Sequence, residues 1–340
     1  MKNKKWISLA AAVVLAVTAL PAGVFAAKRD GTEEKLTKVT LNEVAHSIFY
    51  APQYVAIEEG YFEEEGLDLT LVTGFGADKV LTALISGEAD IGFMGAEASV
   101  YAYQEGATDP VVNFAQLTQR AGNFLVAREE MPDFKWEDLK GEKVLGGRKG
   151  GMPEMVFEYI LKKNGMDPQK DLTIDQSIDF GSTAAAFTGD DSAAYTVEFE
   201  PSATILEKEG AGYVVASLGE ASGYVPYTSY STKASYMKEN PEIIQKFTDA
   251  LQKGMDYVQS HTPEEIAEVI APQFKETDLE TITAIVKRYY DQDTWKENLI
   301  FEKDSFELLQ DILEDAGELT DRTAYENLVQ TEYAQKACKN

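Results

Sequence analysis

Hydrophobic and polar residues alternate along several short segments, the period typical of β-strands. The first such segment, Lys38–Val44, is followed by an apolar stretch over Ala51–Glu59. Gly60 stands just past this stretch, which therefore predicts a helix with glycine beyond its last turn. A strand, a helix and a third strand are expected next, at Leu67–Val72, Asp78–Ser86 and Ala89–Met94. Such alternation predicts parallel strands joined by helical crossovers.

The pattern of the first third repeats in a second unit, which has one clear helix at Glu154–Lys163. This unit begins after a strand at Val111–Leu117, and its own strands are expected at Phe124–Arg128, Lys143–Gly146, Leu172–Ile178, Ala194–Val197 and Gly212–Ala216. No linker rich in Pro, Gly or Ser separates the two units. We therefore expect two lobes between which the chain crosses more than once.

From Asn240 onward the apolar spacing becomes that of helices, and we expect four of them. Asn240-Pro241 predicts a helix N-cap followed by a proline in the first turn. Thr262–Glu265 and Thr277–Glu280 both fit a capping box, with Thr at the N-cap and Glu three residues later.

Composition narrows the class of protein mainly by exclusion. The chain has 340 residues, 44% of them hydrophobic, which suffices for one large core or two moderate ones. Its 58 acidic and 31 basic residues give a net charge of −27, which argues against nucleic acid as a partner. Cys338 is the lone cysteine, so neither an intrachain disulfide nor a cysteine-based zinc site can form. We expect no metal and no cofactor.

The first 26 residues have the features of a secretory signal peptide. Lysines within Met1–Lys5 precede an apolar stretch over Ile7–Leu20. Small residues then occupy the third and the first position before a cleavage site after Ala26. The stretch is shorter than the roughly 20 apolar residues that span a bilayer, which disfavours an uncleaved anchor. We expect export from the cytoplasm, to the periplasm or the outer face of the cell membrane.

A lipid anchor through this region is not expected. Leu20–Gly23 is similar to the first part of a lipoprotein signal, but Val24 stands where the acylated cysteine would be.

Motifs of enzyme chemistry are largely missing. The chain contains no HExxH, GxSxG or Walker motif and no calcium-loop spacing. Gly74–Lys79 follows a strand and opens a helix, but Lys79 replaces the third glycine of a dinucleotide fingerprint. Two interpretations stay open for this loop: a backbone approach to a ligand, or a tight turn that needs positive φ.

Aromatic, acidic and glycine residues gather where the predicted strands end. The segments are Ala45–Pro52, Met94–Glu97, Gly147–Glu154 and Tyr195–Pro201. Ligands of open α/β sheets bind at the carboxyl ends of strands, so these loops are candidates for one site. Each signal has a structural alternative, since a lone histidine more often packs than binds, and charges beside glycine are often solvated.

Several of these segments carry a family resemblance. The stretches are APQYVA at Ala51–Ala56, EGYFEEEGLD at Glu59–Asp68, SGEADIG at Ser86–Gly92, WEDLKG at Trp136–Gly141 and LKKNG at Leu161–Gly165. Over roughly Val39–Val258 the chain resembles the solute-binding proteins of ABC importers for nitrate, sulfonate, taurine and thiamine-pyrimidine precursors. The resemblance implies an α/β, two-lobed fold of the type II periplasmic-binding-protein kind, with a mainly parallel sheet in each lobe and a helical C-terminal segment. It also implies a monomer that works with a membrane permease.

We place lobe 1 at residues 36–122 and 225–335 and lobe 2 at residues 123–224. The chain would cross between them near Arg120–Asn123 and Gly223–Tyr227. Ligand contacts made by both lobes would then favour hinge closure.

Carried over by position, the loops named above give the candidate ligand-binding residues. They are His46, Phe49, Tyr50, Phe75, Gly76, Gly95, Glu97, Arg120, Gly150, Met152, Glu198, Glu200 and Tyr227. The aromatic rings and carboxylates favour a neutral or cationic aromatic heterocycle, such as a vitamin precursor, because carboxylates repel anions and accept N–H donors. Arg120, Arg148 and Lys149 keep a small anion as the alternative.

Enzymes on the same fold remain a third, less favoured interpretation, and no catalytic residue is expected. They include a pyrimidine-phosphate synthase and a dehydratase of menaquinone synthesis. The synthase family relies on a cysteine-rich segment with histidine, which this chain lacks. Both enzymes would work in the cytoplasm, which a signal peptide disfavours.

Overall fold

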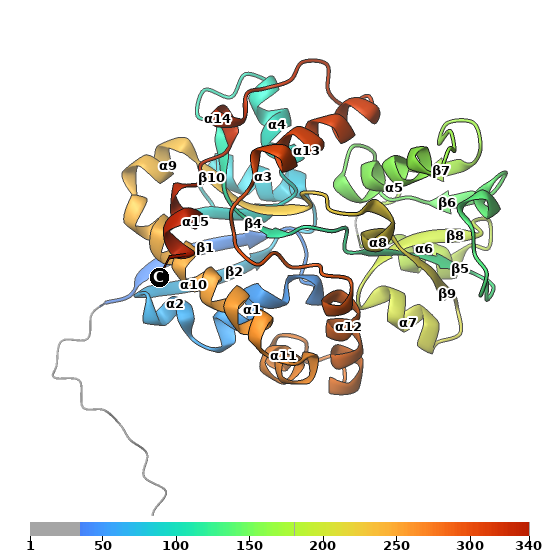
Figure 1. Ribbon diagram of the computed structural model, residues 1–340, viewed down its shortest axis with the longest axis horizontal. Coiled ribbons are helices and arrows are strands. Elements are labelled where there is room, and N and C mark those ends of the chain that lie inside the picture. The colour runs from blue at the N-terminus through green and yellow to red at the C-terminus, as the bar shows by residue number, and fades with distance from the viewer. Residues whose placement is uncertain (1–34, 180, 340) are drawn as a thin grey trace, which may run out of the picture. The chain divides into compact units, whose positions relative to one another are not determined.

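The computed structural model describes residues 35–179 and 181–339, and the predicted signal peptide lies outside these residues. Within them, the strands form two five-stranded sheets (Figure 1). The first sheet has the strand order β2-β1-β3-β10-β4, and the second has the order β7-β6-β8-β5-β9.

The first sheet is built mostly from the first third of the chain. Its strands are β1 (Thr37–Glu43), β2 (Leu67–Thr73), β3 (Ile91–Met94), β4 (Val111–Thr118) and β10 (Thr228–Lys233). The connecting helices are η1 (Ile48–Tyr50), α1 (Ala51–Glu58), α2 (Tyr61–Glu64), α3 (Ala77–Ser86) and α4 (Glu97–Gln104). The expected glycine beyond α1 is confirmed, because Gly60 has a φ of 74°.

The second sheet contains the middle of the chain. Its strands are β5 (Asn123–Ala127), β6 (Lys143–Leu145), β7 (Thr173–Asp175), β8 (Tyr195–Phe199) and β9 (Tyr213–Ser217). Its helices are η2 (Trp136–Leu139), α5 (Met152–Lys163), α6 (Thr183–Gly189), α7 (Ser202–Lys208) and α8 (Leu218–Ser222). The strand expected over Leu172–Ile178 is shorter in the structure, where β7 has only three residues.

Both sheets are mixed in the same way. In the first, β1 pairs in parallel with β2 and β3, whereas β10 runs antiparallel between β3 and β4. In the second, β6 pairs in parallel with β7 and β8, whereas β5 runs antiparallel between β8 and β9. One strand in each sheet therefore opposes the other four, and the sheets are mainly parallel as expected.

The antiparallel strand is in each case the first strand after the chain crosses from the other sheet: β5 in the second sheet and β10 in the first. Residues 119–122 join β4 to β5, and residues 223–227 join α8 to β10. The first connection overlaps the predicted crossing segment Arg120–Asn123, and the second coincides with Gly223–Tyr227. The exact lobe boundaries stay a prediction.

Strand β10 was missing from the sequence-based elements. Its residues are mostly Ser and Thr, yet it is buried between β3 and β4. Neighbouring elements accept hydrogen bonds from these hydroxyls: Ser229 Oγ donates to Asn113 Oδ1 (2.7 Å), and Thr232 Oγ1 donates to the Asp90 carbonyl (2.6 Å). A central strand that carries its own hydrogen-bond donors shows no hydrophobic alternation, so its pattern does not reveal it.

The C-terminal third is helical. Its elements are α9 (Ala234–Glu239), α10 (Pro241–Ser260), α11 (Pro263–Ile270), η3 (Ala271–Gln273), α12 (Leu279–Asp291), α13 (Lys303–Asp315), α14 (Tyr325–Leu328) and α15 (Glu332–Ala337). The expected number of four helices after Asn240 is too low, because the described residues contain six α-helices there, α10–α15, of which α14 and α15 are short. Helix α10 packs on α1 of the first sheet, whereas α13 reaches α5 of the second.

The predicted helix starts are confirmed at two of three places. Asn240 is the N-cap of α10, with proline in the first turn. Thr262 caps α11 in a capping box: its Oγ1 accepts from the N–H of Glu265, whose carboxylate accepts from the Thr262 N–H. The prediction for Thr277 was wrong by one residue, because Asp278 caps α12 and accepts from the Thr281 N–H (2.9 Å).

No helix in the described part of the chain is long and apolar enough to cross a membrane.

Candidate functional site

A pocket of about 210 Å³ lies where loops of the two sheets meet. The loops after β1, β2 and β3 line it from the first sheet, and those after β6 and β8 from the second. The candidate residues that line the pocket are His46, Tyr50, Phe75, Gly76, Gly95, Glu97, Met152, Glu198, Glu200 and Tyr227. Phe49, Arg120 and Gly150 do not line it, and their structural roles differ.

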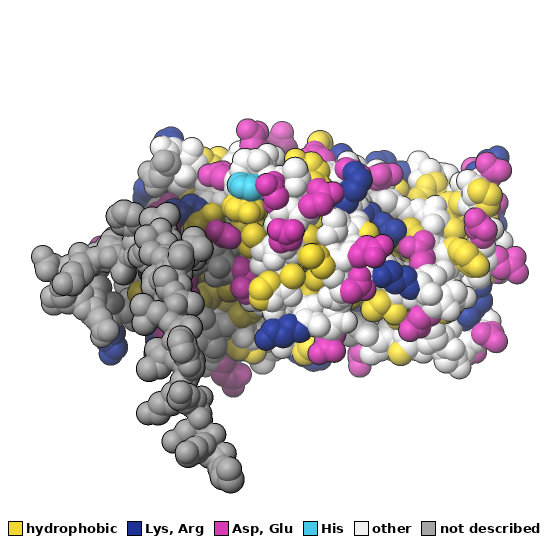
Figure 2. Space-filling view, turned by 90° about the horizontal axis from the view of Figure 1, so that it is seen from below, with side chains coloured by type: hydrophobic (Ala, Val, Ile, Leu, Met, Phe, Trp, Pro, Cys, Tyr) yellow, Lys and Arg dark blue, Asp and Glu magenta, His cyan; other side chains and the backbone are white. Residues whose placement is uncertain are grey.

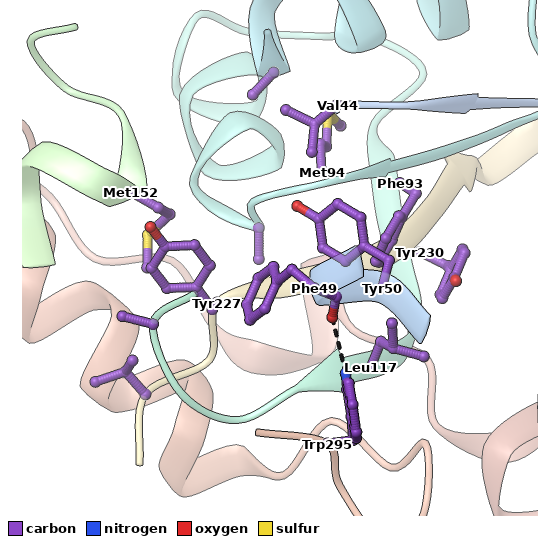
Figure 3. Packing of buried hydrophobic residues seen from close by; sticks show 14 of the residues in the cluster. Val44, Phe49, Tyr50, Phe93, Met94, Leu117, Met152, Tyr227, Tyr230 and Trp295 are labelled. Atoms are coloured by element: carbon purple, nitrogen blue, oxygen red, sulfur yellow. Dashed lines mark hydrogen bonds between the residues drawn. The ribbon is translucent and has the colours of Figure 1, made fainter. Parts of the chain in front are cut away.

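Phe49 lies behind the pocket, in the hydrophobic core (Figure 3). Its ring is fully buried, with its centroid 5.0 Å from that of Tyr50 and 5.7 Å from that of Tyr227. The indole N–H of Trp295 donates to the Phe49 carbonyl (2.8 Å). A Cβ on Gly122 would lie 2.6 Å from the Phe49 ring, so this ring packs on the backbone of the first crossing segment. Phe49 therefore supports the rings that face the pocket.

Arg120 and Gly150 are also placed away from the pocket surface. Arg120 Nη1 donates to the Gly219 carbonyl (3.2 Å), and its guanidinium lies 4.4 Å from the ring centroid of Tyr224. These contacts keep Arg120 at the crossing segments. The Gly150 carbonyl accepts a hydrogen bond from the Tyr101 hydroxyl (3.0 Å) across the two sheets.

A buried carboxylate that the sequence analysis did not single out organises the first loop. Glu43, at the end of β1, has no exposed surface. Its carboxylate accepts from Gln53 Nε2 and the Tyr54 hydroxyl at 2.8 Å each and from Thr73 Oγ1 at 3.0 Å. His46 Nδ1 lies 2.8 Å from Glu43 Oε1.

His46 uses both ring nitrogens within the protein. Nδ1 faces the Glu43 carboxylate, and Nε2 lies 3.0 Å from the Gln273 carbonyl oxygen. Both partners accept, so two N–H donors, as in an imidazolium, fit this geometry best. The hydrogen bond to Glu43 raises the pKa of His46, although burial opposes the shift. His46 can therefore offer a ligand its ring surface but no free nitrogen.

Two buried carboxyls, one from each sheet, line the pocket without a cation bonded to them. Glu97 is 3% exposed, and burial raises its pKa to about 7, although its own N–H, the charge of Arg148 and the Met152 N–H lower it. Glu97 Oε2 has no hydrogen-bond partner among the described residues. Glu198 is also 3% exposed and has a pKa raised to about 7 by burial. It accepts from Thr196 Oγ1 (2.6 Å).

Glu200 differs from these two because its carboxylate is fully engaged. It accepts from the backbone N–H and hydroxyl of Thr204 (2.9 and 3.0 Å) and from Arg288 Nη1 (2.5 Å). Its own carbonyl accepts from Ser47 Oγ (2.9 Å). Glu200 therefore joins α7 to α12 and the second sheet to the loop after β1, which leaves its carboxylate little capacity for a ligand.

The glycine-rich segment after β2 is a tight turn with positive φ. Phe75 has a φ of 56°, unusual for a residue with a side chain, and Gly76 follows with a φ of 140°. The Phe75 ring is 60% exposed at the pocket. A large apolar ring held in this conformation and open to solvent is a candidate ligand contact.

Further contacts join the loops of the two sheets around the pocket. Arg148 Nη2 lies 3.6 Å from Asp78 Oδ1, and Lys149 Nζ lies 3.4 Å from Glu318 Oε1. Both pairs are partly exposed, so each contributes little by itself. The Arg148–Asp78 pair and the buried bond from Ser47 join the two sheets at the pocket, whereas Lys149 joins the loop after β6 to the segment that follows α13.

No cluster of three or more His, Cys, Asp or Glu side chains in residues 35–179 and 181–339 is arranged to hold a metal ion.

Comparison with known proteins places this site in a family. The family model "NMT1/THI5 like" matches residues 48–266, which include all the pocket-lining loops except the first residues of the loop after β1. The chain belongs to the NMT1/THI5-like family. It is 45% identical over 332 residues to a protein of Bacillus subtilis named "Putative binding protein YtlA", covering 98% of both chains.

More distant relatives of this NMT1/THI5-like chain carry names that mention heterocycles. It is 24% identical to the riboflavin-binding protein RibY of Chloroflexus aurantiacus, over 75% of this chain and 74% of the relative. It is 25% identical to the 4-amino-5-hydroxymethyl-2-methylpyrimidine phosphate synthase THI11 of Saccharomyces cerevisiae, over 62% and 63% of the two chains.

Solved structures confirm the two-lobed α/β fold of periplasmic binding proteins. The alkanesulfonate-binding protein SsuA of Xanthomonas axonopodis matches with a TM-score of 0.69 and 16% identity, over 87% of this chain and 99% of its own. The nitrate-binding protein NrtA of Synechocystis matches with a TM-score of 0.70 and 16% identity, over 90% and 89%.

Of the supporting residues that the sequence analysis missed, only Glu43 could have been found from the sequence pattern. Glu43 falls in the same strand register as Val39 and Leu41, both buried, so an acid at that position must be satisfied inside the protein. Gln53 and Tyr54, from α1, and Thr73, from β2, satisfy it. Their spacing along the chain gives no sign that they meet.

Proposed function

We propose that this chain is an extracytoplasmic solute-binding protein that captures a small molecule between its two sheets and delivers it to an ABC permease. The family, the fold and the 45% identity to a protein named as a binding protein support this role. The signal-peptide features of residues 1–26 support export.

The proposed ligand is an aromatic heterocycle that carries N–H donors and is neutral or cationic. The observation that supports it most strongly is the pair Glu97 and Glu198, which reach the pocket from opposite sheets. Each carboxyl has lost its water without gaining a bonded cation, so N–H groups of a ligand would compensate both. Tyr50, Phe75 and Tyr227 supply ring surfaces for a planar molecule.

The helix starts around the pocket disfavour an anionic ligand. Helix N-termini are the usual binding sites of small anions, and α3, α4, α5, α6 and α7 all begin at the pocket. Four of these starts already hold an acidic side chain of the protein, namely Asp78, Glu97, Glu154 and Glu200. At the fifth, Thr183 bonds with Glu198. A sulfonate or nitrate would meet carboxylates where it needs donors.

The basic side chains that would favour an anion already have acceptors within the protein. Arg120 lies at the crossing segments, and Arg148, which lines the pocket, is close to Asp78. The relatives with "riboflavin" and "pyrimidine" in their names fit the heterocycle better than the anion. Their low identity leaves the choice among heterocycles to experiment.

A thermal-shift panel tests the proposed function. The mature protein, from Ala27 onward, is heated with aminopyrimidines, thiamine, riboflavin, taurine, alkanesulfonates and nitrate, each over a range of concentrations. A ligand at about 100 times its Kd adds roughly 2.7 kcal/mol of stability, which raises Tm clearly. We expect a shift with one class of heterocycle. A shift with anions alone would keep the binding role and overturn the ligand class.

A further inference from the structure

The carboxyl group of Glu97 occupies a position between two helix starts that belong to different sheets. Glu97 is the first residue of α4, and its own N–H lowers the pKa of its carboxyl. Met152 is the first residue of α5, on the other side of the pocket, and its N–H acts on the same carboxyl. Helix N-termini carry partial positive charge, so the two together attract one negative group.

The surrounding residues are shaped to receive this carboxyl. Gly95 carries no side chain, and a Cβ at this position would lie only 2.0 Å from Glu97 Oε2. The positive charge of Arg148 also acts on the Glu97 carboxyl. Two helix starts, a guanidinium and a glycine that makes room are the features of a site for a small oxyanion. Here the protein fills the site with its own side chain.

One oxygen of this buried carboxyl remains available. Glu97 is 97% buried, and its Oε2 has no hydrogen-bond partner in the described part of the chain. The residue lines the pocket together with Gly95 and Met152. The carboxyl therefore lies beside both helix starts in a residue that lines the pocket, and no group of the described residues is bonded to Oε2.

We propose that Glu97 determines the ligand class of this pocket by occupying an oxyanion site between α4 and α5. It rejects anions because their place is taken, and its Oε2 keeps an unused hydrogen-bond capacity that a ligand donor would fill. This inference rests on the proposed function, and it attributes the ligand class of the pocket to a single residue. It predicts that removal of the side chain turns the position into a binding site for small carboxylates and sulfonates.

The test is a titration of Glu97→Ala with formate and with methanesulfonate at constant ionic strength, at about pH 8, above the pKa of Glu97. We expect Glu97→Ala to bind formate at least about tenfold more tightly than the wild type does, a difference of about 1.4 kcal/mol. Amide NMR signals of Ala98 and Met152 should shift with bound formate. Glu97→Gln, which fills the space, should bind no formate.

Two further variants keep the test decisive. Glu198→Ala also removes a buried pocket carboxyl, but from a place without two helix starts, so it should gain no formate binding. If Glu97→Ala does not fold, Glu97→Ser is used, because a Ser hydroxyl is well tolerated at a helix start. A folded variant at Glu97 that binds formate no better than the wild type does would overturn the inference.

The outcome also separates this inference from the proposed function. Heterocycle binding by the wild type without gain of formate binding in the variants contradicts only the role of Glu97. Tight binding of anions by the wild type contradicts both.

Discussion

Buried carboxyls around the pocket differ in their partners, and the partners decide what each can do. Glu43 accepts several hydrogen bonds, and Glu200 is paired with Arg288, so both act inside the protein. Glu97 and Glu198 have raised pKa values because burial is not offset by a bonded cation. A buried carboxyl without such a partner lowers the stability of the free protein, and a ligand that bonds to it can offset this cost.

Replacing Glu198 by Gln should stabilise the free protein in a pH-dependent way. The folded pKa of about 7 lies above the usual 4.5, so stability falls as pH rises between these values. At pH 8 Glu198→Gln should raise the free energy of unfolding by on the order of 3 kcal/mol, and at pH 4 hardly at all. Urea unfolding at both pH values measures this. The exposed control Glu63→Gln should change little at either, and equal effects at both pH values for Glu198→Gln would contradict the assignment.

The stability that the His46–Glu43 ion pair contributes should change over the pH range in which His46 loses its proton. Its folded pKa is raised above 6.5, so its contribution is complete below pH 6.5 and is lost as pH rises through the folded pKa. His46→Gln should therefore destabilise the protein more at pH 6 than at pH 9. Chemical denaturation of wild type and variant at the two pH values tests this. NMR signals of the imidazole nitrogens should show both protonated at pH 6.

At the scale of elements, the site is made by loops that follow strands, with helices that start at the pocket. The periodicity of hydrophobic residues predicts β1, β2, β3, β6 and β8 close to their observed positions, and these strands place the loops. The residue at which a helix begins depends on which polar side chain accepts the N-cap hydrogen bond. At α12, two adjacent residues qualify, and the structure selects Asp278 over Thr277.

Substitution of each of these two residues should distinguish them. Asp278→Ala should lower Tm, because the N–H of Thr281 loses its acceptor, whereas Thr277→Ala should leave Tm nearly unchanged. The pKa of Asp278 is lowered to about 2, so its contribution is present above pH 3.8 and is lost as pH falls toward 2. Thermal melts at pH 7 and pH 2.5 measure both effects. Equal losses from the two variants at pH 7 would contradict the cap assignment.

What the sequence can predict follows from how local each feature is. The pocket loops could be found because they follow strands with a clear period, and ten of the thirteen candidate residues line the pocket. Phe49 could not be told from its neighbour Tyr50, since only packing shows that one ring supports the other. Strand β10 and the Glu43 cluster were missed because their polar groups are satisfied by residues distant in sequence.

At the scale of the whole molecule, the two crossing segments and the contacts across the pocket connect the sheets. Acidic, basic and apolar side chains are interspersed over the face in Figure 2. The bond from Ser47 Oγ to the Glu200 carbonyl is a buried contact between the loops of the two sheets. Hinge closure around a ligand, which we propose, would depend on this bond more than on the exposed ion pairs.

Removal of this hydroxyl should weaken ligand binding. Ser47→Ala should raise the Kd about fivefold, corresponding to about 1 kcal/mol for one buried hydrogen bond. Ser47→Thr keeps the hydroxyl and serves as the matched control. Calorimetry gives the Kd, and small-angle scattering with and without ligand reports compaction. An unchanged radius at saturation would contradict closure.

The most direct test of the ligand class is calorimetric titration of the wild type and of Glu97→Gln and Glu198→Gln with the best heterocycle and with an alkanesulfonate. We predict that the wild type binds the heterocycle and not the sulfonate. Each substitution should weaken heterocycle binding by about tenfold or more, since a hydrogen bond to a charged group contributes about 1.5–3 kcal/mol. Sulfonate binding by the wild type, or heterocycle binding that neither substitution changes, would contradict the account.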